Sequence, residues 1–505
     1  MVKNNKYFIR VIAMFFYIIV ISILLFLVSS LYTYLNTGAD RSKMLHLEVK
    51  KIDQYLPKIA WAENGNEGRF VDDETLKNIE NDYLDAWYVN HVSNKTNTTA
   101  GIEDYYTKNA RKKIYYFIDE NKKNNISIAS TTINHNPDIL FFSEDGQLIV
   151  LEDKEVIEYS SIYENDKFLY DYTSKASYKM MLLLEDGFWR IRHKIKENEE
   201  DLIKNYANVS IDTFEIKGIN YYPQKTPWDT FGDNFDKDVL DKDFKLLNNA
   251  NINTIRIFIP YVDFGKANVE QEKIIKLKTL LDIAETNNLK AVVTLFDFYG
   301  NYNVLDWTLN HRHAEAIVTN LKDHNAILAW DIKNEPDLDF NSRGKQNVIA
   351  WLEHMSLIIK SIDKKHPITI GWSNIESASI LKDVIDFISF HYYEDVDLFE
   401  EKFNQLKKEI PNKKLVLGEY GLSSYSGFWR PFASSEEKQE AYHKKMQKVL
   451  TEKNISFMSW TLYDFDKVPK EVVGSLPWRT NPQKRFGFID TKGNLKPSFK
   501  YISKQ

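Results

Sequence analysis

Apolar runs alternate with helix-like segments along the second half of the chain. From about residue 215, short runs rich in β-branched residues are separated mainly by stretches with apolar residues at helical spacing, such as Leu240, Phe244 and Leu247. The runs predict eight strands, near residues 219, 255, 293, 329, 369, 388, 416 and 458. Strands that alternate with helices indicate a parallel sheet, and eight of them fit a closed (β/α)8 barrel.

An open, doubly wound α/β sheet is the alternative architecture. It would need a glycine-rich phosphate turn after an early strand to suggest nucleotide binding, and the sequence has no G-x-G-x-x-G or Walker-type loop. We therefore favour the TIM barrel, and we assign it to residues 206–505.

Residues 40–205 show a different order of elements. Helical spacing comes first, and then long stretches of β-branched and aromatic residues alternate with polar ones, separated by the turn signals Glu144–Gly146 and Glu185–Gly187. Helices followed by antiparallel strands predict an α+β domain. This order, with the ending "EDGFWRIRH", resembles NTF2-like domains, in which a curved sheet wraps around helices. We expect a spacer or docking role for this region.

The N-terminus predicts a membrane anchor within residues 1–39. Residues 11–39 carry no charge and are mostly apolar, which is long enough for a transmembrane helix. Lys3, Lys6 and Arg10 precede this run, so the N-terminus is expected in the cytoplasm and the rest of the chain outside it. A cleaved signal peptide is the rival, but the run exceeds the usual apolar length and no clear small-x-small cleavage site follows. We expect a single-pass cell-membrane protein.

Charge and cysteine content exclude several functions. The net charge of -6 at pH 7 gives no basic footprint, so nucleic acid is not an expected partner. The chain has no cysteine, which excludes disulfides, thiolate metal sites and cysteine nucleophiles.

Chemically selective residues stand at the ends of the predicted strands. Side chains at strand C-termini of a barrel converge on one mouth. The mouth candidates are Arg256 on the second strand, Asn334 and Glu335 on the fourth, His391 and Tyr393 on the sixth, Glu419 on the seventh and Trp460 on the eighth. Two carboxylates on different strands suit glycosidic cleavage, because one must be protonated and the other ionised. Arg256 and Tyr393 would favour the charged form of one glutamate.

At these residues the chain resembles a known family. Residues 217–498 resemble the clan A glycoside hydrolases, closest to the family 5 cellulase and mannanase group. The matching motifs, in order, are "NINTIRI", "WDIKNEP", "ISFHYY", "LVLGEYG", "MSWTLYDF" and "GFIDTKGNLKPS". The resemblance implies that Glu335 is the general acid/base and Glu419 the nucleophile, and that the anomeric configuration is retained through a covalent glycosyl-enzyme.

The resemblance also implies roles for the other mouth residues. Asn334 would grip the sugar 2-hydroxyl, Arg256 and Tyr393 would hold the nucleophile, and Trp460 would form the floor under the sugar. His391 is a substrate-binding candidate or a packed supporting histidine. One departure is the end of the third strand, where many family members have a histidine and this chain has "TLFDFYGNYN". Asp297 or Tyr299 are the candidates to replace it.

Two further sets of residues suggest binding roles. His311 and His313 suggest metal ligands, but they fall on a predicted helix at the wrong spacing for one face, so we expect a solvated helix, and no metal or cofactor. Four tryptophans in predicted loops either stack on sugar rings or pack in the core: Trp228, Trp307, Trp429 and Trp478.

The sequence thus predicts a membrane-anchored retaining β-glycosidase with a β-linked glycan as substrate. Polysaccharide synthesis or export proteins are the hypothesised partners, because a hydrolase fixed at the membrane suits a glycan that is exported or remodelled there. A catalytically weak glycan-binding scaffold is the alternative, although two retained glutamates argue against a pure binder. A transglycosylase would use the same residues.

Overall fold

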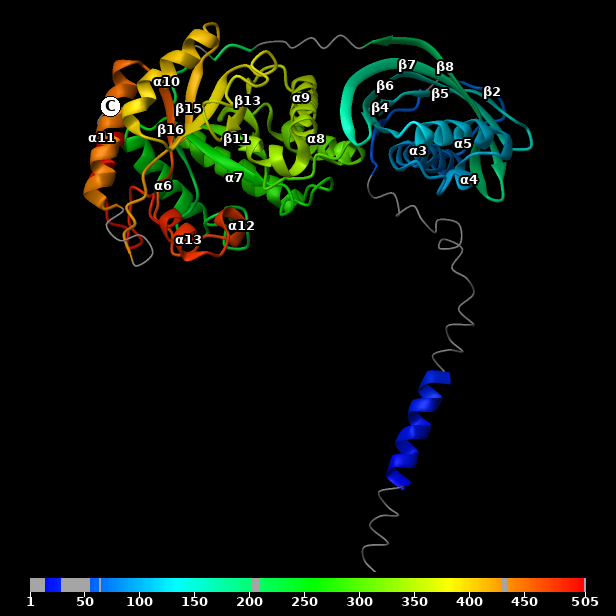
Figure 1. The fold of residues 1–505 in the computed structure, drawn as a ribbon, viewed down its shortest axis with the longest axis horizontal. Helices are drawn as coiled ribbons and strands as arrows, with labels where there is room; N and C mark the ends of the chain where they lie inside the picture. Colours follow the sequence, from blue (N-terminus) through cyan, green and yellow to red (C-terminus); the bar gives the residue numbers. More distant parts are fainter. Residues whose placement is uncertain are drawn as a thin grey trace, which may run out of the picture.

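The structure is a computed structural model, and Figure 1 shows its fold. It describes residues 14–28, 55–62, 65–201, 209–211, 213–427 and 434–503.

Residues 14–28 form a helix. Within the described ranges, no helix combines the length and the apolar character that crossing a membrane requires. The rest of the predicted span, residues 11–13 and 29–39, lies outside the described residues.

Three helices of the N-terminal domain precede its long strands. They are α3 (Asp73–Thr96), α4 (Ile102–Tyr105) and α5 (Lys108–Lys123). The longest, α3, begins where the Asp72 side chain accepts a hydrogen bond from the backbone N–H of Thr75. Ile79, Tyr83 and Trp87 recur on α3 at a spacing of four residues and are buried, so this face of α3 packs against the sheet.

A curled mixed sheet follows these helices and wraps around α3 (Figure 1). Its strands are β2 (Glu67–Gly68), β3 (Ile126–Thr132), β5 (Pro137–Phe142), β6 (Leu148–Glu164), β7 (Lys167–Glu185) and β8 (Phe188–Asp201). The sheet order is β2-β5-β6-β7-β8, with β3 paired to β6. A separate two-stranded parallel sheet consists of β1 (Lys58–Ile59) and β4 (Asn134–His135). The prediction of helices followed by long antiparallel strands is confirmed in this domain, whereas the relationship to NTF2-like domains stays a prediction.

Inside this domain lies a buried polar cluster that the sequence did not indicate. His135 Nδ1 lies 2.5 Å from Asp153 Oδ2, and the Tyr83 hydroxyl donates to the same carboxylate. Thr132 Oγ1 lies 2.7 Å from the other ring nitrogen of His135. All four side chains are buried, so each depends on the others for its hydrogen bonds.

The second domain is a closed barrel of eight parallel strands, as predicted. They are β9 (Lys217–Asn220), β10 (Thr254–Pro260), β11 (Lys290–Asp297), β12 (Ile327–Asn334), β13 (Ile368–Trp372), β14 (Ile388–Tyr392), β15 (Leu415–Tyr420) and β16 (Ser456–Ser459). Each strand pairs with the next along the chain, and β16 closes onto β9. The open-sheet alternative is therefore excluded.

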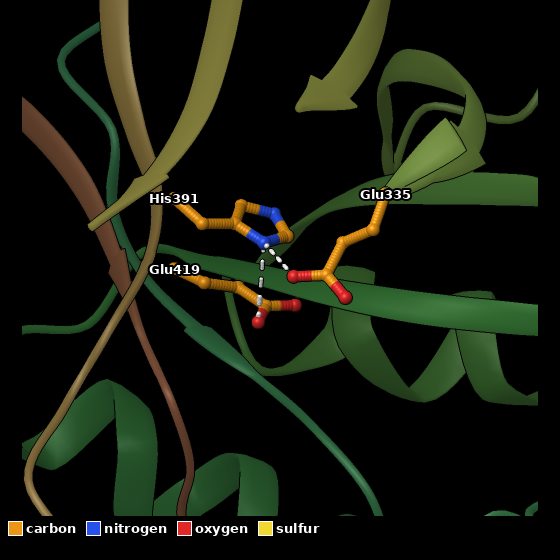
Figure 2. Close-up of side chains that lie close together, drawn as sticks. All are labelled: Glu335, His391 and Glu419. Carbon is orange, nitrogen blue, oxygen red and sulfur yellow. Dashed lines mark hydrogen bonds and ion pairs between the residues drawn. The ribbon is translucent and has the colours of Figure 1, made fainter. Parts of the chain in front are cut away.

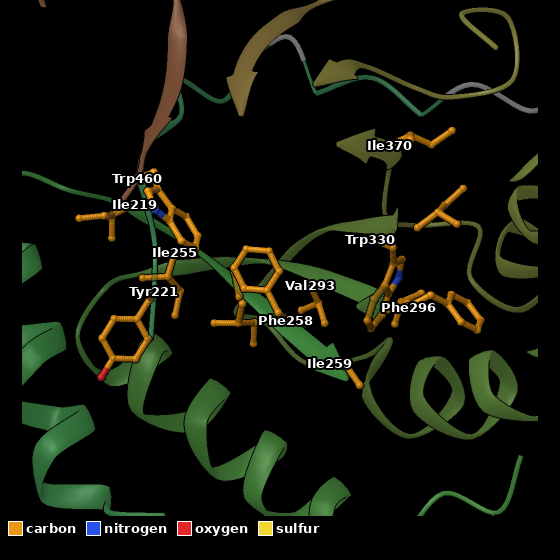
Figure 3. Packing of buried hydrophobic residues seen from close by; sticks show 14 of the residues in the cluster. Ile219, Tyr221, Ile255, Phe258, Ile259, Val293, Phe296, Trp330, Ile370 and Trp460 are labelled. Carbon is orange, nitrogen blue, oxygen red and sulfur yellow. The ribbon is translucent and has the colours of Figure 1, made fainter. Parts of the chain in front are cut away.

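Helices surround the barrel on the outside (Figure 1). The main ones are α6 (Lys237–Asn249), α7 (Gln271–Thr286), α8 (Trp307–Leu321), α9 (Lys345–Ile362), α10 (Val396–Glu409) and α11 (Glu436–Glu452), and the short ones are α12 (Lys470–Val473), α13 (Pro477–Gln483) and α14 (Lys500–Ser503). Figure 3 shows side chains from several strands meeting in the core, among them Ile219, Ile255 and Val293, none of which is exposed. In β10, Ile255, Ile257 and Ile259 alternate with Arg256, which places Arg256 on the opposite face of the strand.

The two domains share one hydrophobic cluster. Tyr159 on β6 packs on Trp307 at the start of α8 with ring centroids 4.4 Å apart, and Trp307 stacks on His354 of α9 at 4.4 Å. The backbone N–H of Leu56 also donates to the Thr308 hydroxyl at 3.0 Å. The N-terminal sheet therefore contacts the barrel helices α8 and α9 through β6.

This packing decides between two alternatives for Trp307 and corrects one expectation from the sequence. Trp307 is fully buried at the domain junction, so of its two alternatives the packed role holds. His311 and His313 lie on a helix as predicted, but both are buried, so the expectation of a solvated helix was wrong. His311 Nε2 lies 2.5 Å from the His354 ring, while His313 reaches two backbone carbonyls. The physical reason is that α8 is covered both by the barrel and by the N-terminal domain.

Candidate active site

Arg256 organises the floor of the barrel mouth. Its Nε and Nη2 donate to Asp331 Oδ2 at 3.0 and 2.6 Å, and Nη2 also donates to Asn334 Oδ1 at 2.9 Å. Its Nη1 donates to Asn220 Oδ1 at 3.1 Å and to Glu419 Oε1 at 2.8 Å. Arg256 is only 1% exposed, so these bonds are its main compensation for lost hydration. The sequence analysis places Arg256 at the end of its strand, but Arg256 lies inside β10, because the strand continues to Pro260.

Asp331 and Asn220 are site residues that sequence reasoning missed. Asp331 also accepts from the Thr294 hydroxyl at 2.8 Å and from the Gly371 backbone N–H at 3.0 Å, so it is held by three neighbouring strands. The available signal was a carboxylate in the middle of the apolar run "ILAWDIKN". A charge at such a position must have a partner, because an unpaired buried carboxylate is costly.

Glu335 follows directly after β12, in a left-handed backbone conformation with φ of 47°. Its backbone N–H donates to the Gly371 carbonyl at 2.7 Å, and Pro336 then starts the short 3-10 helix Pro336–Asp339. A non-glycine residue in this conformation is strained by on the order of 1 kcal/mol, and such strain is concentrated at functional sites. The turn brings the Glu335 carboxyl to His391, whose Nδ1 lies 2.9 Å from Glu335 Oε1.

Glu419 faces Glu335 across His391 (Figure 2). His391 Nδ1 lies 3.5 Å from Glu419 Oε2, and the Tyr393 hydroxyl donates to the same oxygen at 3.0 Å. One carboxylate oxygen of Glu335, one of Glu419 and a ring nitrogen of His391 all lie within 4.8 Å of one another. The two carboxyls thus approach each other closely enough to act on the same glycosidic bond.

The two carboxyls have different surroundings. Burial raises the pKa of Glu419, and the negative charge of Glu335 adds to this, while His391, Arg256 and the Tyr393 hydroxyl act against it. Burial likewise acts to raise the pKa of Glu335, but the hydrogen bond from His391 and the charges of His391 and Arg256 outweigh it, and the pKa is lowered.

The pKa directions would place a shared proton on Glu419, whereas the hydrogen-bond donors would place it on Glu335. Arg256 stays charged at every accessible pH, and its direct bond to Glu419 supports the ionised form of that carboxyl, as does the bond from the Tyr393 hydroxyl. The pKa of Glu335 is lowered chiefly by the hydrogen bond from His391 and then by the charges of His391 and Arg256. The two carboxyls therefore differ in their donors: Arg256 and Tyr393 bond Glu419, and His391 bonds Glu335.

The predicted aromatic floor lies beside these groups. Trp460 follows β16 and is 6% exposed, with Trp228 and Phe258 at ring-centroid distances of 6.0 and 6.4 Å. Trp228 is therefore part of the packed wall behind Trp460 and not an open stacking platform. Of the other weighed tryptophans, Trp478 is 40% exposed, and Trp429 lies outside the described residues.

Asp297, and not Tyr299, occupies the position at the end of β11. Burial raises the pKa of Asp297 to about 6, against the attraction of Lys333 and Arg256, and the Tyr222 hydroxyl lies 3.5 Å from its Oδ2. Tyr299 instead donates to Asn310 at 2.8 Å in the packing behind the loop. Asp297 thus stands where many family members have a histidine, and its carboxyl interacts with the charges of Lys333 and Arg256.

Glu335, His391 and Glu419 are also a set that could hold a metal ion, within the part of the chain described. No such ligand role was predicted. Arg256 Nη1 already lies 2.8 Å from Glu419 Oε1, so the positive charge that a carboxylate pair needs is supplied by the protein itself.

The barrel and its facing carboxyls define a glycoside hydrolase of the (β/α)8 class. The sequence profile described as "Cellulase (glycosyl hydrolase family 5)" matches residues 210–466, about half of the chain. The chain therefore belongs to glycosyl hydrolase family 5, a family of retaining O-glycosyl hydrolases.

Two kinds of characterised relative match the chain. Beta-glucuronidase of Chlorocebus aethiops is 25% identical over 283 residues, which cover 52% of this chain and 40% of the relative. Mannan endo-1,4-beta-mannosidase 5 of Solanum lycopersicum is 29% identical over 170 residues, which cover 25% of this chain and 40% of the relative. The chain thus spans about 40% of the length of these relatives. Among solved structures, an exo-beta-1,4-mannosidase from Opitutaceae bacterium strain TAV5 aligns with a TM-score of 0.49 and 17% identity, over 57% of this chain and 58% of that chain.

Proposed function

We propose that this chain is a retaining β-glycosidase that acts on a β-linked polysaccharide or oligosaccharide. The observation that carries the proposal is the pair Glu335 and Glu419, with oxygens within 4.8 Å and with Arg256 and Tyr393 bonded to only one of the two. This asymmetry separates a nucleophile from an acid, which is what double displacement requires.

The proposed reaction has two steps. In the first step the Glu419 carboxylate attacks the anomeric carbon and forms a glycosyl ester, while Glu335 gives its proton to the leaving oxygen as the glycosidic bond breaks. In the second step Glu335 takes a proton from water, the water oxygen attacks the anomeric carbon, and the ester bond to Glu419 breaks. Loss of the Glu419 charge in the ester lowers the pKa of Glu335 and so prepares it to act as the base.

The remaining mouth residues position the sugar in this proposal. Asn334 is fixed by its bond to Arg256, so its amide nitrogen is free to point at the sugar 2-hydroxyl. His391 bridges both carboxyls and orients Glu335. Trp460 supplies the apolar surface under the ring.

We also propose that the catalytic domain works outside the cytoplasm, fixed to the membrane by residues 1–39. The support is the uncharged run of residues 11–39 behind three basic residues. A glycan under export or remodelling is a suitable substrate for an enzyme held there, and polysaccharide synthesis or export proteins are its proposed partners. Co-purification that recovers the chain without any such partner would count against this association.

The test of the activity is a substrate screen with matched variants. Wild type and Glu419→Ala are assayed on β-glucan, β-mannan, xylan, a glucosamine-containing polymer and aryl β-glucuronides. We expect the wild type to cleave one of these with retention of configuration, seen by NMR of the first-formed product, and Glu419→Ala to be inactive. Equal cleavage by the variant would refute the mechanism. Sugar transfer that exceeds hydrolysis would identify a transglycosylase, and no cleavage of any substrate would favour a glycan-binding scaffold.

A further inference from the structure

A pocket lies between the two domains, at the same end of the barrel as the carboxyl pair. It has a volume of about 360 Å³, within the range of small-ligand sites. The barrel contributes the loops that follow β11 and β12, through Asn301, Tyr302 and Arg343 among others. The N-terminal domain contributes Lys95 from the end of α3 and Tyr163 from β6. Loops after barrel strands belong to the catalytic face, so this pocket extends that face toward the N-terminal domain.

The pocket is linked to the carboxyl pair through one chain of contacts. The Tyr302 hydroxyl donates to Asp339 at 2.5 Å, and Asp339 lies 3.8 Å from the Lys333 amino group. Lys333 precedes Glu335 by two residues, and the loop that begins at Glu335 continues to Arg343. The acid/base candidate and the pocket wall are therefore parts of the same segment.

Two cations face this pocket, and neither forms an ion pair with a carboxylate of the described residues. None of the described residues that line it is an Asp or a Glu. The Lys95 amino group lies over the Tyr163 ring at 4.1 Å, and its pKa is lowered because burial outweighs the attraction of Asp166. The Arg343 guanidinium lies close to Gly300 in the loop after β11. Its Nη2 would be 4.0 Å from the Cβ of a larger residue at position 300. In the described part of the chain, neither cation has a carboxylate within ion-pair distance.

Neutral hydrogen-bonding groups complete the lining. The Tyr163 hydroxyl donates to Asn347 Oδ1 at 2.7 Å, which joins the two domains at the pocket wall. Asn301 and Asn303 are further amides of the barrel side. Amides and tyrosines suit sugar hydroxyls, whereas lysine and arginine form strong, charge-assisted bonds with carboxylates.

We propose that this junction pocket is a subsite for a carboxylate-bearing sugar unit of the glycan. The proposal rests on the proposed function, since it places a uronate unit of the glycan in the pocket while another part of the same glycan is cleaved at the carboxyl pair. It gives the N-terminal domain a direct part in substrate selection through Lys95 and Tyr163. A polymer with uronate units would then bind better than its neutral counterpart.

The test compares two oligosaccharides that differ only in charge. A β-1,4-linked mannuronate oligosaccharide and the β-1,4-manno-oligosaccharide of equal length are titrated by calorimetry into the full chain carrying Glu419→Gln, which prevents turnover. We expect the acidic ligand to bind about 5- to 20-fold tighter at low salt, with the difference shrinking as salt is added. Adding Lys95→Gln and Arg343→Gln together should abolish the difference and leave the neutral affinity within about twofold. Lys278→Gln on α7, an exposed lysine away from the pocket, is the matched control and should change neither affinity.

Equal affinity for the two ligands, or a preference that survives the double variant, would overturn the subsite. Failure of the proposed function gives a different result. If the wild type cleaves no substrate but the charge preference depends on Lys95 and Arg343, the hydrolase assignment fails and the subsite stands. If the wild type cleaves a neutral β-glycan and shows no charge preference, only the subsite fails.

Discussion

The hydroxyl of Tyr393 should set the pH at which the enzyme loses activity on the acid side. It donates to Glu419 Oε2 at 3.0 Å and so stabilises the ionised carboxylate. Tyr393→Phe removes this donor and leaves the ring in place. A hydrogen bond to a charged group contributes about 1.5–3 kcal/mol, and 1.36 kcal/mol corresponds to about one pKa unit. Because Tyr393 is 43% exposed, water replaces part of the lost bond, and we expect an upward shift of about one unit.

The direction of the effect on activity follows from the role of Glu419. A nucleophile must be ionised, so activity is lost as the pH falls through the pKa of the carboxyl pair. Raising that pKa moves the acid limb of the kcat/KM profile to higher pH by about one unit, and on the limb the variant should be about tenfold slower. The assay is the pH dependence of kcat/KM on whichever substrate the screen identifies.

Tyr392→Phe is the matched control for this experiment. The Tyr392 hydroxyl donates to the Asp395 carbonyl at 2.6 Å and bonds neither carboxyl, so its removal should leave the limb in place. An acid limb that does not move in Tyr393→Phe would refute the proposed support of Glu419, even if the rate fell at all pH values. Such a uniform loss would indicate that Tyr393 contacts the sugar instead.

Three other changes test the rest of the structure. Arg256→Met leaves the buried carboxylates without their cation and should cost about 3–5 kcal/mol of unfolding free energy, measured by denaturant titration, while Arg256→Lys should cost less. Glu335→Ala should lower kcat/KM by about 10²–10⁴-fold on a natural glycan, but far less on a dinitrophenyl glycoside, whose leaving group needs no proton; equal losses would contradict the acid role. Tyr159→Ala removes the ring that joins the domains and should cost about 3–5 kcal/mol and speed limited proteolysis, whereas Tyr170→Ala, at a position 54% exposed, should do neither.

Much of the barrel and of its mouth could be predicted from the sequence because the signals are local. Each strand is an apolar run bounded by a helix or loop, and each mouth residue comes within or directly after such a run. Glu335 illustrates this, since Asn334, Glu335 and Pro336 together mark the point where a strand ends and turns. The left-handed conformation of Glu335 is a consequence of this turn, and no helical or strand periodicity encodes it.

The support of Arg256 could not be predicted in this way because it depends on pairing across the barrel. Register places Arg256 beside Asn220 on β9 and Val292 on β11, while Asp331 reaches it from β12. Sequence separation between these groups is large, and nothing in the local pattern of β10 says which acid its arginine will meet. The same limit applies to His135 and Asp153, whose contact depends on the register of β5 and β6, in which Asp153 lies opposite Pro137.

The error about α8 has a further consequence for how the two domains act together. Helical spacing shows which face of α8 meets the barrel, but its other side is buried by a domain that precedes it by more than a hundred residues in the chain. That domain packs on α8 and α9, and these helices begin directly after the loops that follow β11 and β12. Asp297 is the last residue of β11, and Glu335 is the first residue after β12, so both stand where these loops begin. The N-terminal domain therefore contacts the two helices that continue from the loops on the catalytic face, a contact that the spacing within α8 alone does not predict.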